Sequence, residues 1–233
     1  MKIKQGMILA AGLGKRMQPI TSNIPKPLIR VGNKNLLEGA IQLLLDHGVE
    51  EIAINVHHFA DQIKDFINRK KYKIKIIISD EQSLLLDTGG GILQATRSFK
   101  EPFIVVNPDT LWSNNYSHEL KVLENLYFEQ KKTSLLLVNK NLSFDNSFKG
   151  DFNLKNTIVS RDDKNDFIFT GLQILDKGVF SSVKDKIFSM NQIWDFLIKE
   201  NSLIGIESKQ KFYHLNKKET YDKILISKVI DQK

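Results

Sequence analysis

Residues 3–17 read IKQGMILAAGLGKRM, and this stretch decides the fold class. It begins with an apolar run of strand length, residues 3–9, and continues into a turn of small residues that contains Gly12 and Gly14. A strand followed by a glycine-rich turn is typical of the first unit of a doubly wound α/β sheet, where ligands bind at the carboxyl ends of strands. Lys15 and Arg16 come next, so two cations stand where a bound phosphate group would lie.

The rest of the first 140 residues repeats this alternation of strand and helix. Strands are expected at 51–56, 73–79, 103–106 and 134–138, and helices at 36–45, 61–69, 91–97 and 117–130. The alternation predicts a doubly wound, mostly parallel, Rossmann-like sheet. Residues 144–164 are polar, and short strands are expected at 167–175 and 204–214. No linker divides the chain, so we expect a single domain over 1–233, with a core over 1–140 and a small covering lobe and C-terminal helix over 141–233.

Composition narrows the function classes. The 233 residues are 41% hydrophobic and 26% charged, which is ordinary for a globular protein. No apolar run has membrane-spanning length and no signal-peptide pattern begins the chain, so we expect a cytoplasmic protein. The absence of cysteine excludes disulfides, thiolate zinc sites and cysteine nucleophiles. The net charge of +7 comes from scattered lysines mixed with acids, so we expect neither a nucleic-acid nor a membrane partner, and a small anion such as a nucleotide remains.

Three further motifs carry chemistry. In Pro25-Lys26-Pro27 the prolines fix the backbone around a lysine that could face phosphate, or that could be a surface residue in a proline turn. In Leu86-Asp87-Thr88-Gly89-Gly90-Gly91 the glycines permit close backbone approach ahead of a helix, although a flexible loop would read the same. In Val105-Val106-Asn107-Pro108-Asp109 the aspartate follows an apolar strand. Asp109 could there be a cation ligand, or it could cap a helix or turn.

In this order and spacing the four motifs resemble the sugar-nucleotide pyrophosphorylase family of nucleotidyltransferases, over nearly the whole chain. Within that family the chain is most similar to the N-acetylmuramate α-1-phosphate uridylyltransferase branch. The form of the glycine motif at 87–91, the Gly150-Asp151-Phe152 tripeptide and the short length without a repeat domain carry this second resemblance. It implies that UTP reacts with a sugar 1-phosphate to form a UDP-sugar and pyrophosphate. It also implies that this reaction serves the recycling of cell-wall peptidoglycan sugars.

The resemblance also implies roles for single residues. Nucleoside triphosphate would be bound by Leu9, Ala10, Ala11, Gly12, Gly14, Lys15, Arg16, Lys26 and Gly89. Arg16 would hold the leaving pyrophosphate, Lys26 would neutralise charge at the reaction centre, and Asp109 would bind Mg²⁺, so these three are the expected catalytic residues. Asn107, Asp151 and Gly171 would contact the sugar phosphate, in a lobe that binds the sugar.

Two departures from the family pattern matter. Pro108 stands where the family often has glycine, which removes an amide but keeps Asp109 in register. Residues 212–219 read FYHLNKKE, so His214 replaces the second metal-binding aspartate of the family. Because Mg²⁺ prefers oxygen ligands, His214 as a metal ligand and His214 as a structural strand residue both stay open.

The expected chemistry is attack of a sugar 1-phosphate oxygen on the α-phosphorus of UTP. The nucleophile is already anionic, so positioning and charge neutralisation suffice and no general base is needed. Other pairs remain as alternatives, namely mannose 1-phosphate with GTP, glucose 1-phosphate with dTTP and phosphocholine with CTP. A catalytically silent nucleotide-binding relative is the alternative from another class. Oligomeric state cannot be predicted from this sequence.

Overall fold

The computed structural model describes residues 1–100 and 102–227, and within them a nine-stranded sheet forms the centre, with the order β5-β4-β1-β6-β10-β7-β11-β9-β8. Its strands are β1 (Gln5–Leu9), β4 (Glu51–Val56), β5 (Lys75–Asp80), β6 (Phe103–Val106), β7 (Ser134–Asn139), β8 (Asn153–Lys155), β9 (Ile158–Ser160), β10 (Phe167–Leu175) and β11 (Ile204–Ser208). Strands β2 (Arg30–Val31) and β3 (Lys34–Asn35) pair separately. Within the nine strands of the central sheet, as far as the structure describes it, only β9 and β10 run against the others, so the mostly parallel α/β sheet is confirmed.

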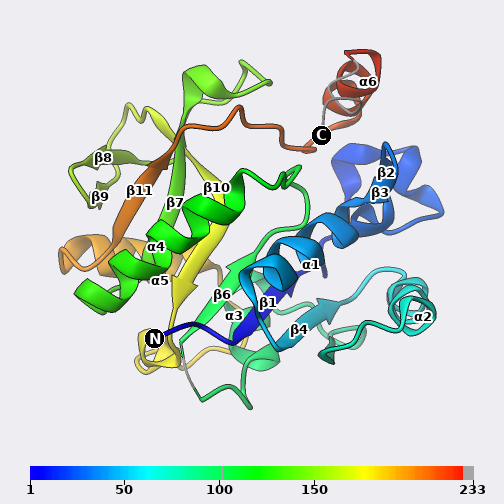
Figure 1. Cartoon of the computed structure of the whole chain (residues 1–233), viewed down its shortest axis with the longest axis horizontal. Helices are drawn as coiled ribbons and strands as arrows, with labels where there is room; N and C mark the ends of the chain where they lie inside the picture. The colour runs from blue at the N-terminus through cyan, green and yellow to red at the C-terminus, as the bar shows by residue number, and fades with distance from the viewer. Residues whose placement is uncertain (101, 228–233) are drawn as a thin grey trace.

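Helices cover both faces of the sheet (Figure 1). They are α1 (Leu36–His47), α2 (Ala60–Lys70), α3 (Asp87–Ala95), α4 (Tyr116–Gln130), α5 (Met190–Lys199) and α6 (Lys218–Ile226). Helices α1, α2 and α4 share one hydrophobic core, and α3 and α5 share the other. Successive strand side chains point to opposite faces, so Met7 lies in the second core and Ile8 in the first. No helix of the described part is long and apolar enough to span a membrane.

Helix α1 begins and ends where local chemistry sets it. The Asn35 side chain accepts from the Glu38 amide at 2.8 Å, and the Glu38 carboxylate accepts from the Asn35 amide at 2.9 Å. This reciprocal pair satisfies two amide donors that would otherwise lack a partner at the first turn. Gly48 closes the helix in the left-handed region, with φ of 90°.

Helix α3 differs from its prediction. A short helix was expected after the glycine run, yet it begins at Asp87 and contains all three glycines. Tertiary packing explains the difference, because a Cβ on Gly89 would lie 2.3 Å from the Phe188 ring and one on Gly90 only 2.2 Å from the Lys186 carbonyl oxygen. The amides of Gly89 and Gly90 both donate to the Phe188 carbonyl. The close approach overrides the low helix propensity of glycine.

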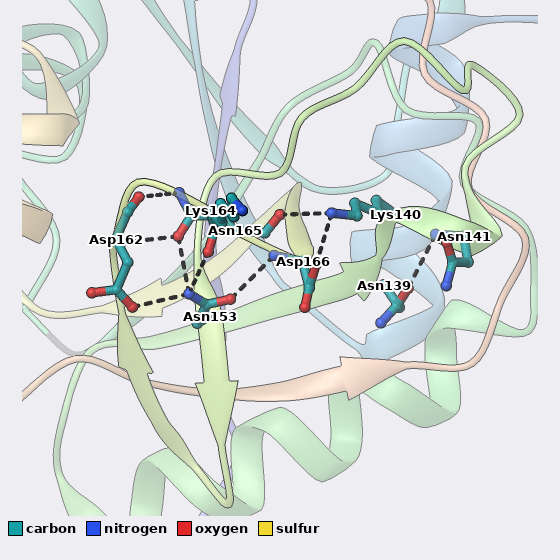
Figure 2. A network of polar contacts seen from close by, with 8 residues as sticks. All are labelled: Asn139, Lys140, Asn141, Asn153, Asp162, Lys164, Asn165 and Asp166. Atoms are coloured by element: carbon teal, nitrogen blue, oxygen red, sulfur yellow. Dashed lines mark hydrogen bonds and ion pairs between the residues drawn. The ribbon is translucent and has the colours of Figure 1, made fainter.

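The polar stretch after β7 is an ordered part of the sheet. Strands β8 and β9 form a hairpin within it that was not predicted, because each strand has only three residues, too few to show a periodic pattern. Figure 2 shows the network beside the hairpin, where the Asn153 amide donates to Asp162 at 3.0 Å and to the Lys164 carbonyl at 2.9 Å. A Lys140–Asp166 ion pair of 2.7 Å extends it towards β7.

Strand β10 lies between β6 and β7, inside the sheet, whereas the sequence suggested that residues 167–175 belong to a lobe laid upon it. It pairs antiparallel with both neighbours, and its register with β7 shifts between Phe169 and Leu172. The last strand is also shorter than expected: β11 ends at Ser208, and residues beyond it make only isolated bridges, such as His214 with Thr110.

Candidate active site

A cavity of about 600 Å³ opens at the carboxyl ends of four parallel strands. Residues at or just after the ends of β1, β4, β5 and β6 form its walls, together with the segment before α3 and one residue near the C-terminal helix. The lining residues are Leu9, Ala11, Gly12, Leu13, Gly14, Lys15, Arg16, Met17, Lys26, Pro27, Leu36, Asn55, Glu81, Leu85, Asp87, Thr88, Asn107, Pro108, Asp109, Ile187 and Asn216. The position agrees with the general rule for ligand sites in open α/β sheets.

The glycine turn after β1 is closed by its own backbone. Gly14 has φ of 63°, a conformation that favours glycine, and its carbonyl accepts from the Met17 amide at 2.8 Å and the Thr21 hydroxyl at 2.9 Å. A Cβ on Gly14 would also lie 2.9 Å from the Thr21 side chain. Exposed Lys15 and Arg16 follow on the cavity wall, and neither pairs with an acid in the described ranges, 1–100 and 102–227.

Among the cavity residues that sequence reasoning missed, Asn55 and Glu81 join the ends of strands. The Asn55 side chain accepts from the Ala10 amide at 2.8 Å and donates to Glu81 at 2.8 Å. Glu81 is 1% exposed, and its other oxygen accepts from the Leu86 amide. This chain of hydrogen bonds fixes three strand ends and the start of α3 around the cavity. The available signal was position, since Asn55 and Glu81 are polar residues at the ends of apolar strands.

Asp109 stands at the centre of a charged cluster. Its Oδ2 lies 2.5 Å from Lys26 Nζ and 3.0 Å from His214 Nε2. Lys26 reaches it from a 3-10 turn, Lys26–Leu28, that begins between the two prolines. Burial by itself would raise the pKa of Asp109, but Lys26 and then His214 outweigh it and hold that pKa well below its usual range. The carboxylate is therefore ionised at neutral pH.

The other oxygen of this carboxylate is available to a cation. Asp109 Oδ1 is buried and has no hydrogen-bond partner in the part of the chain that the structure describes. The described residues contain no group of three His, Asp or Glu side chains that could hold a metal by themselves. Mg²⁺ commonly binds through one or two carboxylates together with substrate phosphates, so a single free oxygen fits that mode.

Comparison with known proteins agrees with this geometry. The model of the nucleotidyl transferase family matches residues 5–142, more than half of the chain. The chain belongs to the nucleotidyl transferase family. It is 29% identical over 221 residues to an N-acetylmuramate alpha-1-phosphate uridylyltransferase of Caulobacter vibrioides, covering 91% of both chains. It is 28% identical over 196 residues to a D-glycero-alpha-D-manno-heptose 1-phosphate guanylyltransferase of Campylobacter jejuni, covering 84% of this chain and 80% of the other.

A solved structure supports the fold of this nucleotidyltransferase. The crystal structure of a UDP-glucose pyrophosphorylase complexed with UDP-glucose superposes with a TM-score of 0.78 at 19% identity, covering 97% of this chain and 98% of the other. Likeness at this identity concerns the fold alone.

Most of the predicted site residues of the nucleotidyltransferase do meet at the cavity. Those on its wall are Leu9, Ala11, Gly12, Gly14, Lys15, Arg16, Lys26, Asn107 and Asp109. Ala10 lies behind the wall and holds Asn55, and His214 contacts Asp109. The amide of Asn107 donates to the Gly171 carbonyl at 2.7 Å, and Gly171 has φ of 92° at the irregular step of β10. The sugar-phosphate role of Asn107 and Gly171 stays a prediction.

Two further predicted residues, Gly89 and Asp151, are also absent from the cavity wall. Gly89 is buried against Phe188, and the neighbouring Asp87 and Thr88 line the cavity in its place. Asp151 is exposed, and its carboxylate accepts from the Phe169 amide at 2.9 Å. That Gly89 or Asp151 contacts a ligand directly therefore stays a prediction, which their positions do not support.

Proposed function

We propose that this nucleotidyltransferase uses UTP and N-acetylmuramate 1-phosphate and forms UDP-N-acetylmuramate and pyrophosphate. One observation carries the reaction type: Asp109 and Lys26 pair at the wall of the cavity. A glycine turn followed by Lys15 and Arg16 lines the same cavity. This is an arrangement for binding polyphosphate, and it offers positioning and charge neutralisation.

In the proposed reaction an oxygen of the sugar phosphate attacks the α-phosphorus of UTP. A new P–O bond forms as the bond from that phosphorus to the bridging oxygen breaks, and the electron pair leaves with pyrophosphate. Lys26 would neutralise charge near the α-phosphorus, and Arg16 would hold the pyrophosphate. The chain needs no proton acceptor, because the attacking phosphate is ionised at neutral pH.

Mg²⁺ is the proposed cofactor. Asp109 Oδ1 would bind it together with triphosphate oxygens, and the ion would supply further charge neutralisation when bound. Oδ2 is already held by Lys26 and His214, which orients the carboxylate. His214 as a second metal ligand is the less favoured interpretation, because its Nε2 faces the carboxylate.

The choice of UTP and of the muramate sugar rests on the relative from Caulobacter vibrioides, which aligns over 91% of this chain. Such a product would serve the recycling of cell-wall sugars in the cytoplasm. Other relatives support different substrates: the guanylyltransferase for a heptose 1-phosphate, and a choline-phosphate cytidylyltransferase of Streptococcus pneumoniae at 24% identity. These make GTP or CTP the second candidates.

A single panel tests the proposal. Purified protein is incubated with each of UTP, dTTP, GTP and CTP against a set of sugar 1-phosphates and phosphocholine, with Mg²⁺, and released pyrophosphate is measured. We expect the highest rate with UTP and N-acetylmuramate 1-phosphate, and loss of turnover in excess EDTA. Release with another pair would replace the substrate assignment, and no release from any pair would favour a silent nucleotide-binding relative.

A further inference from the structure

Residues 212–217, here called the C-terminal strip, bring two side chains to the active site. His214 contacts Asp109, and Asn216 lines the cavity. The strip belongs to no regular strand, and its backbone is held on one side by only a few hydrogen bonds to the segment after β6. The Leu215 amide donates to the Asp109 carbonyl at 2.8 Å, and the Leu111 amide donates to the Tyr213 carbonyl at 2.9 Å.

The other side of the strip is held by the loop after β7, residues 143–148. The Phe144 amide donates to the Phe212 carbonyl at 2.9 Å. The Phe148 ring stacks on the His214 ring, with 5.7 Å between centroids and 18° between planes. The buried side chains of Phe212 and Leu215 anchor the strip in the core. Its polar side chains are placed by contacts such as these, so the loop and the active site are mechanically connected.

Asp145 is the polar centre of this contact. One of its oxygens accepts from the amide and hydroxyl of Ser147, at 3.0 and 2.6 Å, which fixes the loop. The other accepts from Asn216 Nδ2 at 3.3 Å and from the Thr220 hydroxyl at 3.2 Å, and it lies 3.1 Å from Lys217 Nζ. The side chain is 10% exposed and does not line the cavity. Partly buried networks of this kind can fix one arrangement of the groups they join.

We propose that Asp145 is a positioning residue for this nucleotidyltransferase: it holds the C-terminal strip so that His214 contacts Asp109 and Asn216 lines the cavity. The kinetic part of this inference rests on the proposed function, while the structural part concerns only the strip. Removing the carboxylate would free Asn216, Thr220 and Lys217 together from the loop. The strip could then shift away from Asp109 although Asp145 itself touches no substrate.

Two readouts test the proposal in the full-length protein. In Asp145→Ala we expect kcat to fall at least about tenfold, with KM for both substrates changed less than about threefold, because small misplacements at a reaction centre reduce rates strongly. We also expect faster amide hydrogen exchange at Leu215 and Leu111. Asp145→Asn keeps one accepting oxygen for Asn216 and Thr220. Its kcat should therefore lie between that of the wild-type protein and that of Asp145→Ala.

The matched control is Asp166→Ala, which removes another carboxylate of the same lobe, one that pairs with Lys140 and not with a side chain of the strip (Figure 2). It should leave kcat and the exchange at Leu215 unchanged. A double-mutant cycle with Asn216→Ala should be non-additive in kcat, as expected if Asp145 acts through the strip. If Asp145→Ala does not fold, Phe148→Ala is measured in its place, and the same loss of kcat and the same faster exchange are expected.

The outcomes separate the two proposals. Unchanged exchange at Leu215 in a folded Asp145→Ala, or a strictly additive cycle, overturns the positioning role. An equal loss in Asp166→Ala also overturns it, because the effect would then be general to the lobe. Absence of pyrophosphate release from the wild-type protein with every substrate pair overturns the proposed function, and hydrogen exchange still decides whether Asp145 positions the strip.

Discussion

At the scale of single residues, the active site depends on the different partners of the two carboxylate oxygens of Asp109. Oδ2 of Asp109 is shared by Lys26 and His214, and Oδ1 is buried without a partner in the described structure. A carboxylate held by one oxygen keeps its orientation while the other remains free for a ligand. The proposed site therefore needs only one acidic side chain, provided that the triphosphate supplies the remaining oxygens.

Lys26→Ala removes the strongest partner of Asp109 and the cation nearest to the proposed reaction centre. We expect kcat to fall at least about a hundredfold, on the scale of one lost electrostatic donor. The fold should survive, since the Lys26 side chain is still 14% exposed and water can reach the cluster. Steady-state kinetics and circular dichroism measure both.

The control for this variant is Lys121→Ala, an exposed lysine on α4 that is remote from the cavity. Near-normal turnover of Lys26→Ala would show that this residue belongs only to the proline turn.

Asp145 predicts a pH dependence of stability. Burial alone would raise its pKa, but hydrogen bonds from Ser147 together with Lys217 and Asn216 lower it well below the ordinary value. The unfolded chain has a pKa of about 3.9 for aspartate. The ionised group therefore contributes its full stability above about pH 4 and loses it as the pH falls towards the folded pKa. Urea unfolding of wild type and Asp145→Asn between pH 6 and pH 3 should show a smaller loss in the variant, and parallel curves would contradict this.

At the scale of elements, the glycines of α3 serve packing more than flexibility. They let the segment that contains Lys186 and Phe188 lie directly on the helix, and that segment carries Ile187 to the cavity wall. Helix propensity alone would favour alanine at each of these positions. The site thus depends on a close contact between two segments that are about a hundred residues apart, as the hydrogen bond from the Met190 amide to Thr88 also shows.

A pair of glycine substitutions separates propensity from packing. Gly90→Ala should destabilise the protein by about 1–3 kcal/mol, because its Cβ would meet the Lys186 carbonyl oxygen at 2.2 Å. Gly39→Ala in α1 has nothing within 4 Å of the new Cβ and should stabilise by up to about 1 kcal/mol. Urea unfolding measures both, and a stabilised Gly90→Ala would mean that the Phe188 segment moves freely.

The sequence predicted the elements whose local pattern and burial agree. Helix α1, β4 and β6 lie where expected, since apolar periodicity and end signals point to the same bounds. The predicted start of α3 was wrong, because its glycines make room for Phe188, a residue far away in the chain. The hairpin of β8 and β9 was missed because each of its strands has only three residues, too few to reveal a period.

The site was predictable where motifs lie at strand ends, and less so where it depends on distant contacts. Lys26 and Asp109 were both predicted, but nothing in either motif revealed that they pair across the cavity. Asn55 and Asn216 were missed, because a single asparagine carries no motif. Asp145 could not be found at all from sequence, since its partners belong to the strip beyond β11.

At the scale of the whole molecule, the cations are concentrated at one part of the cavity. Lys15, Arg16 and Lys26 line it, whereas Arg161 in the lobe is held by Asp195 at 2.6 Å and by Asn191 at 2.9 Å. The polar stretch of the lobe carries four cations that could face an additional sugar carboxylate, namely Lys149, Lys155, Arg161 and Lys164. Within residues 1–100 and 102–227, Arg161 is the one of these four that forms an ion pair with another side chain.

Sugar preference tests the muramate assignment directly. N-acetylmuramate 1-phosphate carries a lactyl carboxylate that N-acetylglucosamine 1-phosphate lacks. One charged hydrogen bond is worth roughly 1.5–3 kcal/mol, or about a ten- to hundredfold preference. We therefore expect kcat/KM to be higher for N-acetylmuramate 1-phosphate by that factor, measured with UTP. Equal or reversed values would reject the muramate assignment and leave nucleotidyl transfer intact.

The place of β10 in the sheet has a consequence for how the protein is made. On the ribosome, β6 and β7 emerge well before β10, yet β10 separates them in the finished sheet. Until Leu175 has left the exit tunnel, β6 and β7 each lack a neighbouring strand, and unpaired strand edges invite aggregation. We therefore expect nascent chains that end near residue 142 to remain sensitive to protease and to associate with chaperones, although they contain the glycine turn, Lys26 and Asp109. Catalytic competence would then arise late in translation, after the middle of the sheet has been filled.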